Sequence, residues 1–399
     1  MKYFNYLSTE KINRIFFKAP VPITIDSPVQ ELRYGLGGTL YMPPTTIDFH
    51  SIIVNKKISG LGSMVICLED AIKDHEVELA EQALIAGLSE LKKAMMSGLI
   101  DKAQLPFIFI RVRNASHLEK LTDRLCEFED VFLGFVFPKF DQNNSEEFIQ
   151  AFLKFKNKTV SPKYFMPILE SEEIIYVERR TEALLKIKSD LDFVKDHVLN
   201  VRIGATDFCS NFGIRRSKDF TIYQIHTVRD CITEILNVFS RSSSEYVVSG
   251  SVWEYFDVNM RFLKPQLRAT PFTERFGKLG ELRRKKMLSA NFDALIKELI
   301  EDKENGIVGK TVIHPSHLTI VNAIHVVTHE EYSDALSIMG EAQSGGVIRS
   351  EYSNKMNEIK PHINWARKLL MKAEIYGVLN KGFDYLSLLP QEEVESSEK

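Results

Sequence analysis

The sequence predicts an α/β protein built as a (β/α)8 TIM barrel with an N-terminal extension and a C-terminal helical arm. Eight short runs of apolar, β-branched and aromatic residues recur along the chain, and longer segments with helical spacing separate them. Near-continuous apolar strands that alternate with amphipathic helices are typical of parallel βα units, whose strands are covered on both faces. A doubly wound open sheet usually has fewer strands and a glycine-rich first turn, so eight units favour the barrel.

The eight expected strands are all short and mostly apolar. They are 39–43 (TLYMP), 64–70 (MVICLED), 107–113 (FIFIRVR), 134–140 (GFVFPKF), 164–170 (YFMPILE), 200–208 (NVRIGATDF), 246–252 (YVVSGSV) and 310–315 (KTVIHP). The segments between them have helical stripes, in which apolar residues recur with a 3.6-residue period. One such stripe consists of Val77, Leu84, Leu88, Leu91 and Met95. A second stripe runs from Ile225 to Phe239.

The length of 399 residues would by itself suggest two or three domains, but the strand pattern indicates one large barrel. We expect residues 1–38 to be a lead segment that closes the barrel bottom or packs beside it. Residues 39–340 form the expected catalytic barrel. Residues 341–399 are expected to be a C-terminal arm with a Gly345-Gly346 turn, a helix within 362–377 and a disordered acidic tail at 391–399.

Composition excludes several classes of function. The 51 Lys and Arg residues nearly balance the 54 Asp and Glu residues, so no positive field favours a nucleic-acid partner. No apolar run is long enough to span a membrane, and the N-terminus lacks the apolar core of a signal peptide. The four cysteines are scattered without a CxxC pair, which is typical of reduced thiols. We therefore expect a cytoplasmic protein without a membrane partner.

Charged residues follow five of the expected strands, and they predict a site. In a TIM barrel the chemistry lies at the carboxyl ends of the strands, so charges at these positions should meet at one mouth. The residues are Glu69 with Asp70, Arg111 with Arg113, Lys139, Glu170 and Asp207.

Glu170 and Asp207 are the candidate metal ligands. They end neighbouring expected strands and should lie about 5 Å apart. Two carboxylates that close repel each other unless a positive group lies between them. A hard divalent cation such as Mg²⁺ would fit, because it binds few carboxylates and keeps several waters. The alternative is that each carboxylate caps the helix that follows it.

Arg111 and Arg113 share one face of the third expected strand and suit bidentate binding of a carboxylate or phosphate. The alternative is an ion pair with Glu69 or Asp70 on the neighbouring strand. Those two carboxylates could accept hydrogen bonds from waters on the metal, or cap the next helix. Lys139 could meet a substrate anion or pair with a neighbouring carboxylate.

Three other features are weaker signals. Residues 35–38 (GLGG) lead into a strand and are interpreted as a turn, not as a phosphate-binding loop. The histidine pairs His314/His317 and His325/His329 lack acidic or cysteine partners, so we do not expect a zinc site. The basic run at 283–286 is interpreted as a solvated helix face, with a phosphate contact as the alternative.

Seven motifs occur in an order that resembles the citrate lyase β-subunit-like branch of the HpcH/HpaI aldolase family. The chain has LYMPP, ICLEDAI, IRVRN, GFVFPK, PILES, IGATDF and GKTVIHPSH. The usual family patterns are LFVPG, DLEDAV, VRIN, GIVLPK, IET, GAEDL and GKWAIHP. The resemblance covers about residues 39–340. The greater length of this chain is similar to that of the divergent TIM-barrel C–C bond lyase branch.

The resemblance implies a Mg²⁺-binding barrel that makes or breaks C–C bonds next to a carbonyl, often on acyl-thioesters. The metal carboxylates of the family fall on Glu170 and Asp207. Its substrate-binding arginine falls on Arg111, or on Arg113 if the register is shifted by two residues.

The remaining correspondences include two departures from the family. The carboxylates of the family's LED motif fall on Glu69 and Asp70. Pro44 stands where the family usually has glycine. The C-terminal MIDxPH segment, whose Asp reaches a neighbouring subunit's site in some members, is replaced by residues 356–362, in which Glu358 is the acidic residue.

These observations together predict a Mg²⁺-dependent lyase or aldolase that acts on a 2-oxo or 3-hydroxy acid, with a coenzyme A thioester as a further candidate substrate. Cleavage would generate an enolate, whose charge a divalent cation stabilises. Arg111 would bind the substrate carboxylate, and the hydroxyl proton would go to a water on the metal, to Glu69 or to Glu358. The family and the C-terminal arm favour a homo-oligomer.

Two alternative functions remain open. One is a phosphoenolpyruvate/pyruvate-type barrel enzyme, which would keep the barrel and the metal. The other is an inactive barrel that serves as a subunit of a biosynthetic complex, which the altered C-terminal motif suggests.

Overall fold

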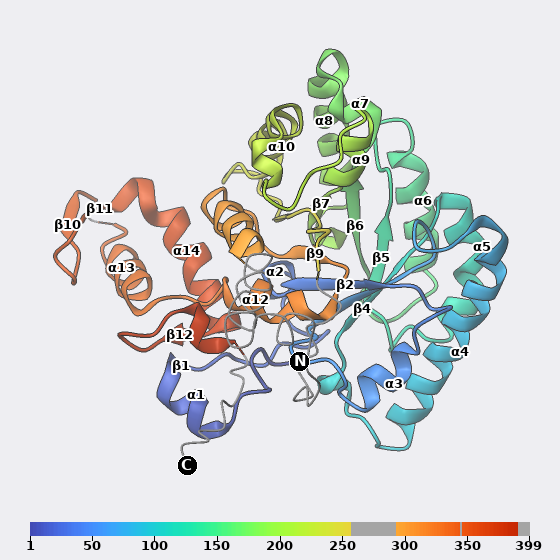
Figure 1. Cartoon of the computed structure of the whole chain (residues 1–399), viewed down its shortest axis with the longest axis horizontal. Coiled ribbons are helices and arrows are strands. Elements are labelled where there is room, and N and C mark those ends of the chain that lie inside the picture. The colour runs from blue at the N-terminus through green and yellow to red at the C-terminus, as the bar shows by residue number, and fades with distance from the viewer. Residues whose placement is uncertain (257–292, 344, 390–399) are drawn as a thin grey trace, which may run out of the picture.

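The computed structural model describes residues 1–256, 293–343 and 345–389, and its centre is a barrel of eight parallel strands (Figure 1). The strands are β2 (Gly38–Met42), β3 (Ser63–Cys67), β4 (Phe107–Arg111), β5 (Gly134–Phe137), β6 (Tyr164–Leu169), β7 (Val201–Ile203), β8 (Val248–Ser249) and β9 (Lys310–Val312). In the sheet they follow the order β8-β7-β6-β5-β4-β3-β2-β9. The predicted (β/α)8 fold class is confirmed.

The barrel closes between β8 and β9. A single parallel bridge joins Gly250 to Lys310 at this seam. Around it, the Thr311 amide donates to the Gly250 carbonyl at 3.1 Å, and the Gly250 amide donates to the Gly309 carbonyl at 3.0 Å. The Lys310 side chain points out of the barrel and pairs with Glu298 at 2.8 Å, within the helical residues 293–304. The seam is therefore short but supported by a buried ion pair.

All eight expected strands are present, although all except the first are shorter than predicted. Residues 200–208 were expected to be one strand, but β7 ends at Ile203 and a helix begins at Ala205. Gly204 lies between them with φ −98° and ψ 70°, so the chain turns there. Similarly, only Val248 and Ser249 form β8 within the apolar run 246–252.

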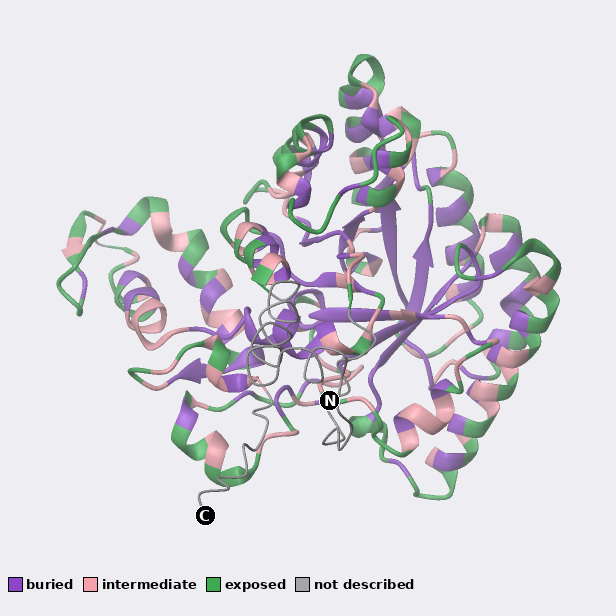
Figure 2. Cartoon of the chain, in the orientation of Figure 1, coloured by how far each residue is buried: buried purple, intermediate pink, exposed green. Residues whose placement is uncertain are grey.

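The helices of the described chain mostly follow the strands and cover the outside of the barrel. They are α1 (Thr9–Ile15), α2 (Val29–Tyr34), α3 (Phe49–Val54), α4 (Val77–Met96), α5 (Ala115–Cys126), α6 (Ser145–Lys156), α7 (Glu172–Ile175), α8 (Val177–Asp192), α9 (Ala205–Ser210), α10 (His226–Phe239), α12 (Leu318–Ala323), α13 (His329–Gly340) and α14 (Ile359–Tyr376). Leu84, Leu88 and Leu91 of α4 are fully buried, as the stripe predicts. Figure 2 shows buried strands and helices whose outer faces are exposed.

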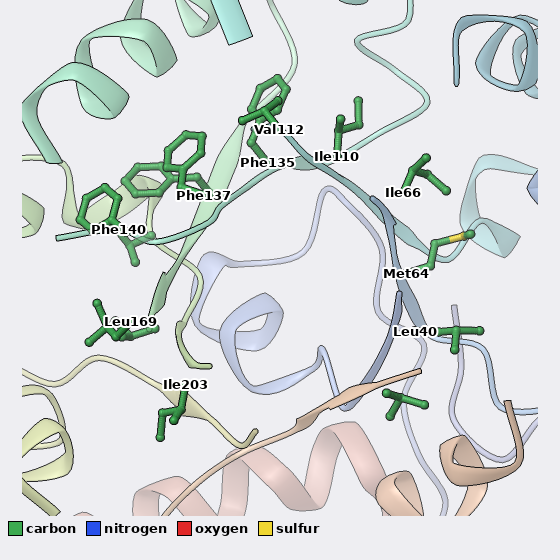
Figure 3. Packing of buried hydrophobic residues seen from close by; sticks show 14 of the residues in the cluster. Leu40, Met64, Ile66, Ile110, Val112, Phe135, Phe137, Phe140, Leu169 and Ile203 are labelled. Atoms are coloured by element: carbon green, nitrogen blue, oxygen red, sulfur yellow. The ribbon is translucent and has the colours of Figure 1, made fainter. Parts of the chain in front are cut away.

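Strand residues alternate between the outer apolar layer and the barrel interior. Figure 3 shows Leu40, Met64, Ile110 and Ile203 pointing away from the ring of strands, where they join one large core cluster with the helices. Because successive side chains of a strand point to opposite faces, the residues between them face inward. Arg111 faces the interior, because it alternates with the outward Ile110.

The N-terminal residues close the end of the barrel opposite the mouth. The Arg33 guanidinium of α2 donates to the backbone carbonyls of Val198, at 3.0 Å, and Lys195. The Tyr3 hydroxyl donates to the Gly35 carbonyl at 2.9 Å. Beside this plug, β1 (Phe16–Lys18) pairs antiparallel with β12 (Val378–Leu379), so the two ends of the described chain lie together.

The C-terminal part forms a small helical lobe beside the barrel (Figure 1). Helices α13 and α14 pack through a cluster that includes Ala335, Ile338 and Ala366. A hairpin of β10 (Val347–Arg349) and β11 (Met356–Glu358) precedes α14, which contains the predicted 362–377 helix. The expected acidic tail and the basic run at 283–286 lie outside the described residues. In the described ranges, no helix has both the length and the apolarity to cross a membrane.

Candidate active site

Arg111 is the centre of a charged cluster at the mouth of the barrel. It ends β4, and its Nη2 atom lies 2.7 Å from Glu69 Oε2, 2.9 Å from Asp70 Oδ2 and 3.2 Å from Glu170 Oε1. Glu69 and Asp70 follow β3, and Glu170 follows β6. The Arg111 side chain is only 7% exposed. Burial alone would lower the pKa of Arg111, but the attraction of Glu170 and Glu69 outweighs it and raises that pKa.

Lys139 joins the cluster through both its side chain and its backbone. Its Nζ atom lies 2.8 Å from Glu69 Oε1, and its amide donates to Glu170 Oε1 at 2.9 Å. Lys139 has φ 47°, a left-handed conformation that turns the chain sharply after β5. This turn points the Lys139 amide at Glu170. The carboxylate partner that the sequence predicts for the Lys139 side chain is Glu69.

Glu170 and Asp207 also meet, although Asp207 does not end a strand. It lies in the first turn of α9, which begins directly after Gly204. A side-chain hydrogen bond links the Asp207 and Glu170 carboxyl groups. Burial raises the pKa of Glu170; Arg111 opposes this increase, and Asp207 adds to it. The pKa of Asp207 is raised too, by burial first and by Asp70 second.

Gly204 is required for this arrangement because a larger residue would displace Glu170. A Cβ atom at position 204 would lie 2.2 Å from Glu170 Oε2 and 2.5 Å from Glu170 Cβ. Real Cβ atoms do not approach other atoms so closely, so Glu170 packs directly against the backbone of Gly204. The same glycine ends β7 and starts the helix that carries Asp207.

The charges of the cluster fit a divalent cation. Arg111 and Lys139 balance two of the four carboxylates, and the remaining two negative charges equal the charge of one Mg²⁺ ion. The contact between Glu170 and Asp207 needs a shared proton or a cation, since two ionised carboxylates in contact repel each other. In the described ranges no group of three or more His, Cys, Asp or Glu side chains is arranged around a metal position. A cation at this pair would therefore keep several waters or substrate oxygens, as Mg²⁺ usually does.

Two predicted residues lie apart from the cluster. Arg113 pairs with Asp74, whose side chain is 92% exposed, and not with the central carboxylates. Glu358 lies on β11, in the helical lobe outside the ring of strands (Figure 1). Within one chain, the structure places neither residue among the charges at the mouth.

The helix-capping alternatives are wrong for this site. Helix α4 begins at Val77 and its N-cap position is Glu76, well after Glu69 and Asp70. The N-cap position of α7 is Ser171, and that of α9 is Gly204. An intervening loop separates Glu69 and Asp70 from α4, which leaves them free to contact Arg111. The ion pair of Arg111 with Glu69 and Asp70, which is the alternative to substrate binding by this arginine, is present.

Arg202 and Tyr41 are residues near the site that the sequence reasoning did not select. Both face the barrel interior, because Arg202 alternates with the outward Ile203 and Tyr41 with the outward Leu40. A signal existed in the sequence, since Arg202 is a charged residue inside the short apolar run NVRIG. A charged residue within a barrel strand indicates a structural or functional role, because burying a charge costs free energy.

The fold is a TIM barrel with carboxylates and an arginine gathered at the carboxyl ends of its strands. Residues 30–378 match the family described as C–C bond lyase of the TIM-barrel fold. The chain therefore belongs to this C–C bond lyase family, and the predicted resemblance to citrate lyase-like proteins is confirmed.

Solved structures of citrate lyase-like proteins have the same fold. Protein CitE from Mycobacterium tuberculosis, in complex with magnesium, acetoacetate and coenzyme A, superimposes with a TM-score of 0.52 at 15% identity, covering 86% of this chain and 99% of CitE. A citrate lyase from Burkholderia xenovorans gives a TM-score of 0.57 at 14% identity, covering 89% of this chain and 96% of the other. At such identities the similarity concerns the fold alone. No curated protein matches the sequence.

Proposed function

We propose that this chain is a Mg²⁺-dependent C–C bond lyase or aldolase that acts on a 2-oxo or 3-hydroxy acid or on its acyl-thioester. The observation that carries the proposal is the contact of Arg111 with Glu69, Asp70 and Glu170, together with the Glu170–Asp207 pair. Membership of the C–C bond lyase family supports the reaction class. The magnesium, acetoacetate and coenzyme A bound to CitE are compatible with the proposed cation and substrates.

Glu170 and Asp207 are the residues that would hold the cation. A divalent cation there would supply positive charge next to the carbonyl at which negative charge develops. Lys139 contributes by fixing Glu170 through its backbone amide. Gly204 contributes by leaving room for the Glu170 carboxylate.

Arg111 would bind the substrate carboxylate. Its Nη2 atom is already used by three carboxylates, while its buried Nε–H has no hydrogen-bond partner among the described residues. A buried donor without a partner costs free energy that a bound acceptor would recover. Glu69 and Asp70 hold the guanidinium in place, so it can orient a carboxylate without rearranging.

Cleavage in this site would follow the retro-aldol pattern. The substrate hydroxyl loses its proton, its carbon becomes a carbonyl, and the electron pair of the breaking C–C bond moves toward the neighbouring carbonyl as an enolate. Glu69 and Asp70 are the proposed proton acceptors, with Asp70 the more open of the two because its side chain is 51% exposed. We further propose a cytoplasmic homo-oligomer, in which the free thiols of the described cysteines would stay reduced.

The proposal is tested by calorimetric Mg²⁺ titration and by turnover of candidate 2-oxo and 3-hydroxy acids. Asp207→Ala is expected to abolish measurable Mg²⁺ binding and lyase turnover together. The control is Glu146→Gln, which changes an exposed carboxylate on α6 that pairs only with Lys186 in the described chain. If the wild-type protein fails to bind Mg²⁺ at millimolar concentration, the lyase proposal is wrong and a non-catalytic barrel is favoured.

A further inference from the structure

The barrel interior has an apolar part and a polar part. Apart from Arg111 and from Ser63, which hydrogen-bonds to Thr39 at 3.0 Å, strands β3 to β6 contribute inward apolar side chains that form one cluster: Val65, Phe107, Phe109, Val136, Met166 and Ile168. Strands β7, β8, β9 and β2 instead contribute inward polar side chains: Arg202, Ser249, Thr311, Thr39 and Tyr41. We call these five residues the polar quadrant. Barrel interiors are normally filled with branched apolar residues, so a polar quadrant requires a separate explanation.

Arg202 is the charged member of the polar quadrant, and no acidic side chain among residues 1–256, 293–343 and 345–389 pairs with it. Its side chain donates to Thr311 Oγ1 at 2.9 Å and to Thr39 Oγ1 at 3.4 Å, and its guanidinium lies 5.6 Å from the centre of the Tyr41 ring. Arg202 is 1% exposed. The charged and titratable groups that act on it are Tyr41 and Arg111, and neither is a carboxylate. Burial lowers the pKa of Arg202; Tyr41 opposes this decrease, and Arg111 adds to it.

Several polar atoms of the quadrant also lack hydrogen-bond partners. Among the described residues these include Arg202 Nε and Ser249 Oγ, both of which are buried, while the buried Tyr41 Oη interacts with Arg202 alone. A buried unpaired polar group costs on the order of 1–3 kcal/mol, and a buried unpaired charge costs more. These unpaired polar atoms destabilise the folded protein unless a bound ligand supplies their hydrogen-bond partners.

Two members of the polar quadrant are partly exposed. Tyr41 and Thr311 keep part of their surface accessible, whereas Thr39, one inward position nearer the barrel bottom on β2, is fully buried. The partly exposed surface of the polar quadrant therefore lies toward the carboxyl ends of the strands. The charges of Arg202 and Arg111 both act on Tyr41, and its ring centre lies 5.6 Å from the Arg202 guanidinium.

We propose that Arg202, Tyr41 and Thr311 form an inner carboxylate-binding subsite, and that the substrate is a dicarboxylic acid with one carboxylate at Arg202. This inference rests on the proposed function and narrows its substrate class. One uncompensated guanidinium matches the single charge of a carboxylate, while the hydroxyls of Tyr41 and Thr311 supply further donors. A phosphate dianion would leave one negative charge unbalanced beside the carboxylates of the mouth.

Replacing Tyr41 by phenylalanine tests the Tyr41 hydroxyl by itself. Phenylalanine would fill the same space without the hydroxyl. Tyr41→Phe is therefore a mild change that removes one proposed donor and leaves the apolar contacts of the ring.

The test measures binding of succinate to the full-length protein by calorimetry and by thermal unfolding, in EDTA without added metal. Wild-type protein is expected to bind succinate and to gain thermal stability from it. Arg202→Met is expected to weaken succinate binding roughly 10-fold to 100-fold, the range of one lost charge-assisted hydrogen bond. Without succinate its Tm should equal or exceed that of the wild type, because an unpaired buried charge has been removed. Tyr41→Phe should weaken binding severalfold and keep the wild-type fold.

The control is Arg180→Met, which removes another buried arginine. Arg180 is fully partnered, since it donates to the Ile174 and Ile175 carbonyls and pairs with Glu234. This variant is expected to lower the Tm and to keep succinate affinity. Wild-type succinate affinity in both Arg202→Met and Tyr41→Phe would overturn the subsite, and so would a wild-type protein that does not bind succinate. Because no metal or turnover is involved, these outcomes are independent of the Mg²⁺ and lyase tests.

Discussion

Arg111 on β4 and Glu170 after β6 are joined by a 3.2 Å contact that passes over the end of β5. The same guanidinium nitrogen contacts Glu69 and Asp70 after β3. One side chain therefore ties together the carboxyl ends of three strands. This arrangement gives Arg111 a structural role in addition to its proposed substrate contact.

Arg111→Met should destabilise the protein strongly. Removing the cation leaves Glu170 buried without a cationic side-chain partner, while Glu69 keeps only Lys139; breaking a buried pair in this way typically costs about 3–5 kcal/mol of unfolding free energy. The control is Arg113→Met, two residues after the end of β4, which removes an arginine whose partner Asp74 is 92% exposed. An exposed ion pair contributes about 0–1 kcal/mol. Urea denaturation measures both variants, and equal losses would contradict the central role of Arg111.

Gly204→Ala should displace Glu170 and disrupt cation binding. The new Cβ atom would lie 2.2 Å from Glu170 Oε2, so the carboxylate must move. We expect Mg²⁺ affinity to fall at least about tenfold if one ligand contact is lost. Gly340→Ala is the matched control, because a Cβ atom there meets nothing within 4 Å. Calorimetry of both variants provides the comparison, and unchanged Mg²⁺ affinity in Gly204→Ala would count against Glu170 as a ligand.

Mg²⁺ binding should become tighter as the pH rises. The pKa values of Glu170 and Asp207 are both raised, mainly by burial, so the pair keeps a proton to higher pH than ordinary carboxyls do. A cation must displace that proton, and binding therefore releases protons. Calorimetric Mg²⁺ titrations in two buffers with different ionisation enthalpies would give the number of protons released. Asp207→Asn should remove the pH dependence along with most of the affinity, whereas pH-independent binding would argue for ligands elsewhere.

His317 should make the protein less stable in mild acid. Burial lowers its pKa from 6.5 to about 4. Between these two pH values the unfolded chain binds a proton that the folded protein does not, so stability falls as the pH drops from 6.5 toward 4 and is fully retained above 6.5. The loss amounts to at most about 3 kcal/mol. His317→Asn should flatten this part of the stability profile measured by urea denaturation at pH 5 and pH 7.5; an unchanged slope would refute the assignment.

The barrel itself could be predicted because its strands are apolar and its helices amphipathic. Leu84, Leu88 and Leu91 of α4 are fully buried as their spacing predicts. Strand ends were harder to predict, because hydrophobic runs do not show where the backbone turns. Gly204 illustrates this limit: its role follows from the close approach of Glu170, a contact between two strands that no local pattern encodes.

Strand-end charges predicted much of the candidate site, since parallel strands bring their carboxyl ends together regardless of sequence distance. The sequence could not distinguish Arg111 from Arg113, because it predicts both on one face of a strand that in the structure ends at Arg111. The two side chains differ in exposure. Arg202 was missed for a different reason. Its neighbours are apolar, and only the three-dimensional ladder shows that Ser249, Thr311 and Tyr41 surround it with polar atoms.

The pairing of β1 with β12 has a consequence for the order in which the chain assembles. Phe16 lies opposite Leu379, so this two-stranded ladder encloses the whole barrel sequence. Contacts between such distant residues carry a large loop-closure entropy until the intervening chain has folded. Residues 16–18 are synthesised before residues 378–379, so β1 cannot pair until more than 350 further residues have been added. The β1–β12 ladder is therefore expected to form late in folding, after the intervening barrel.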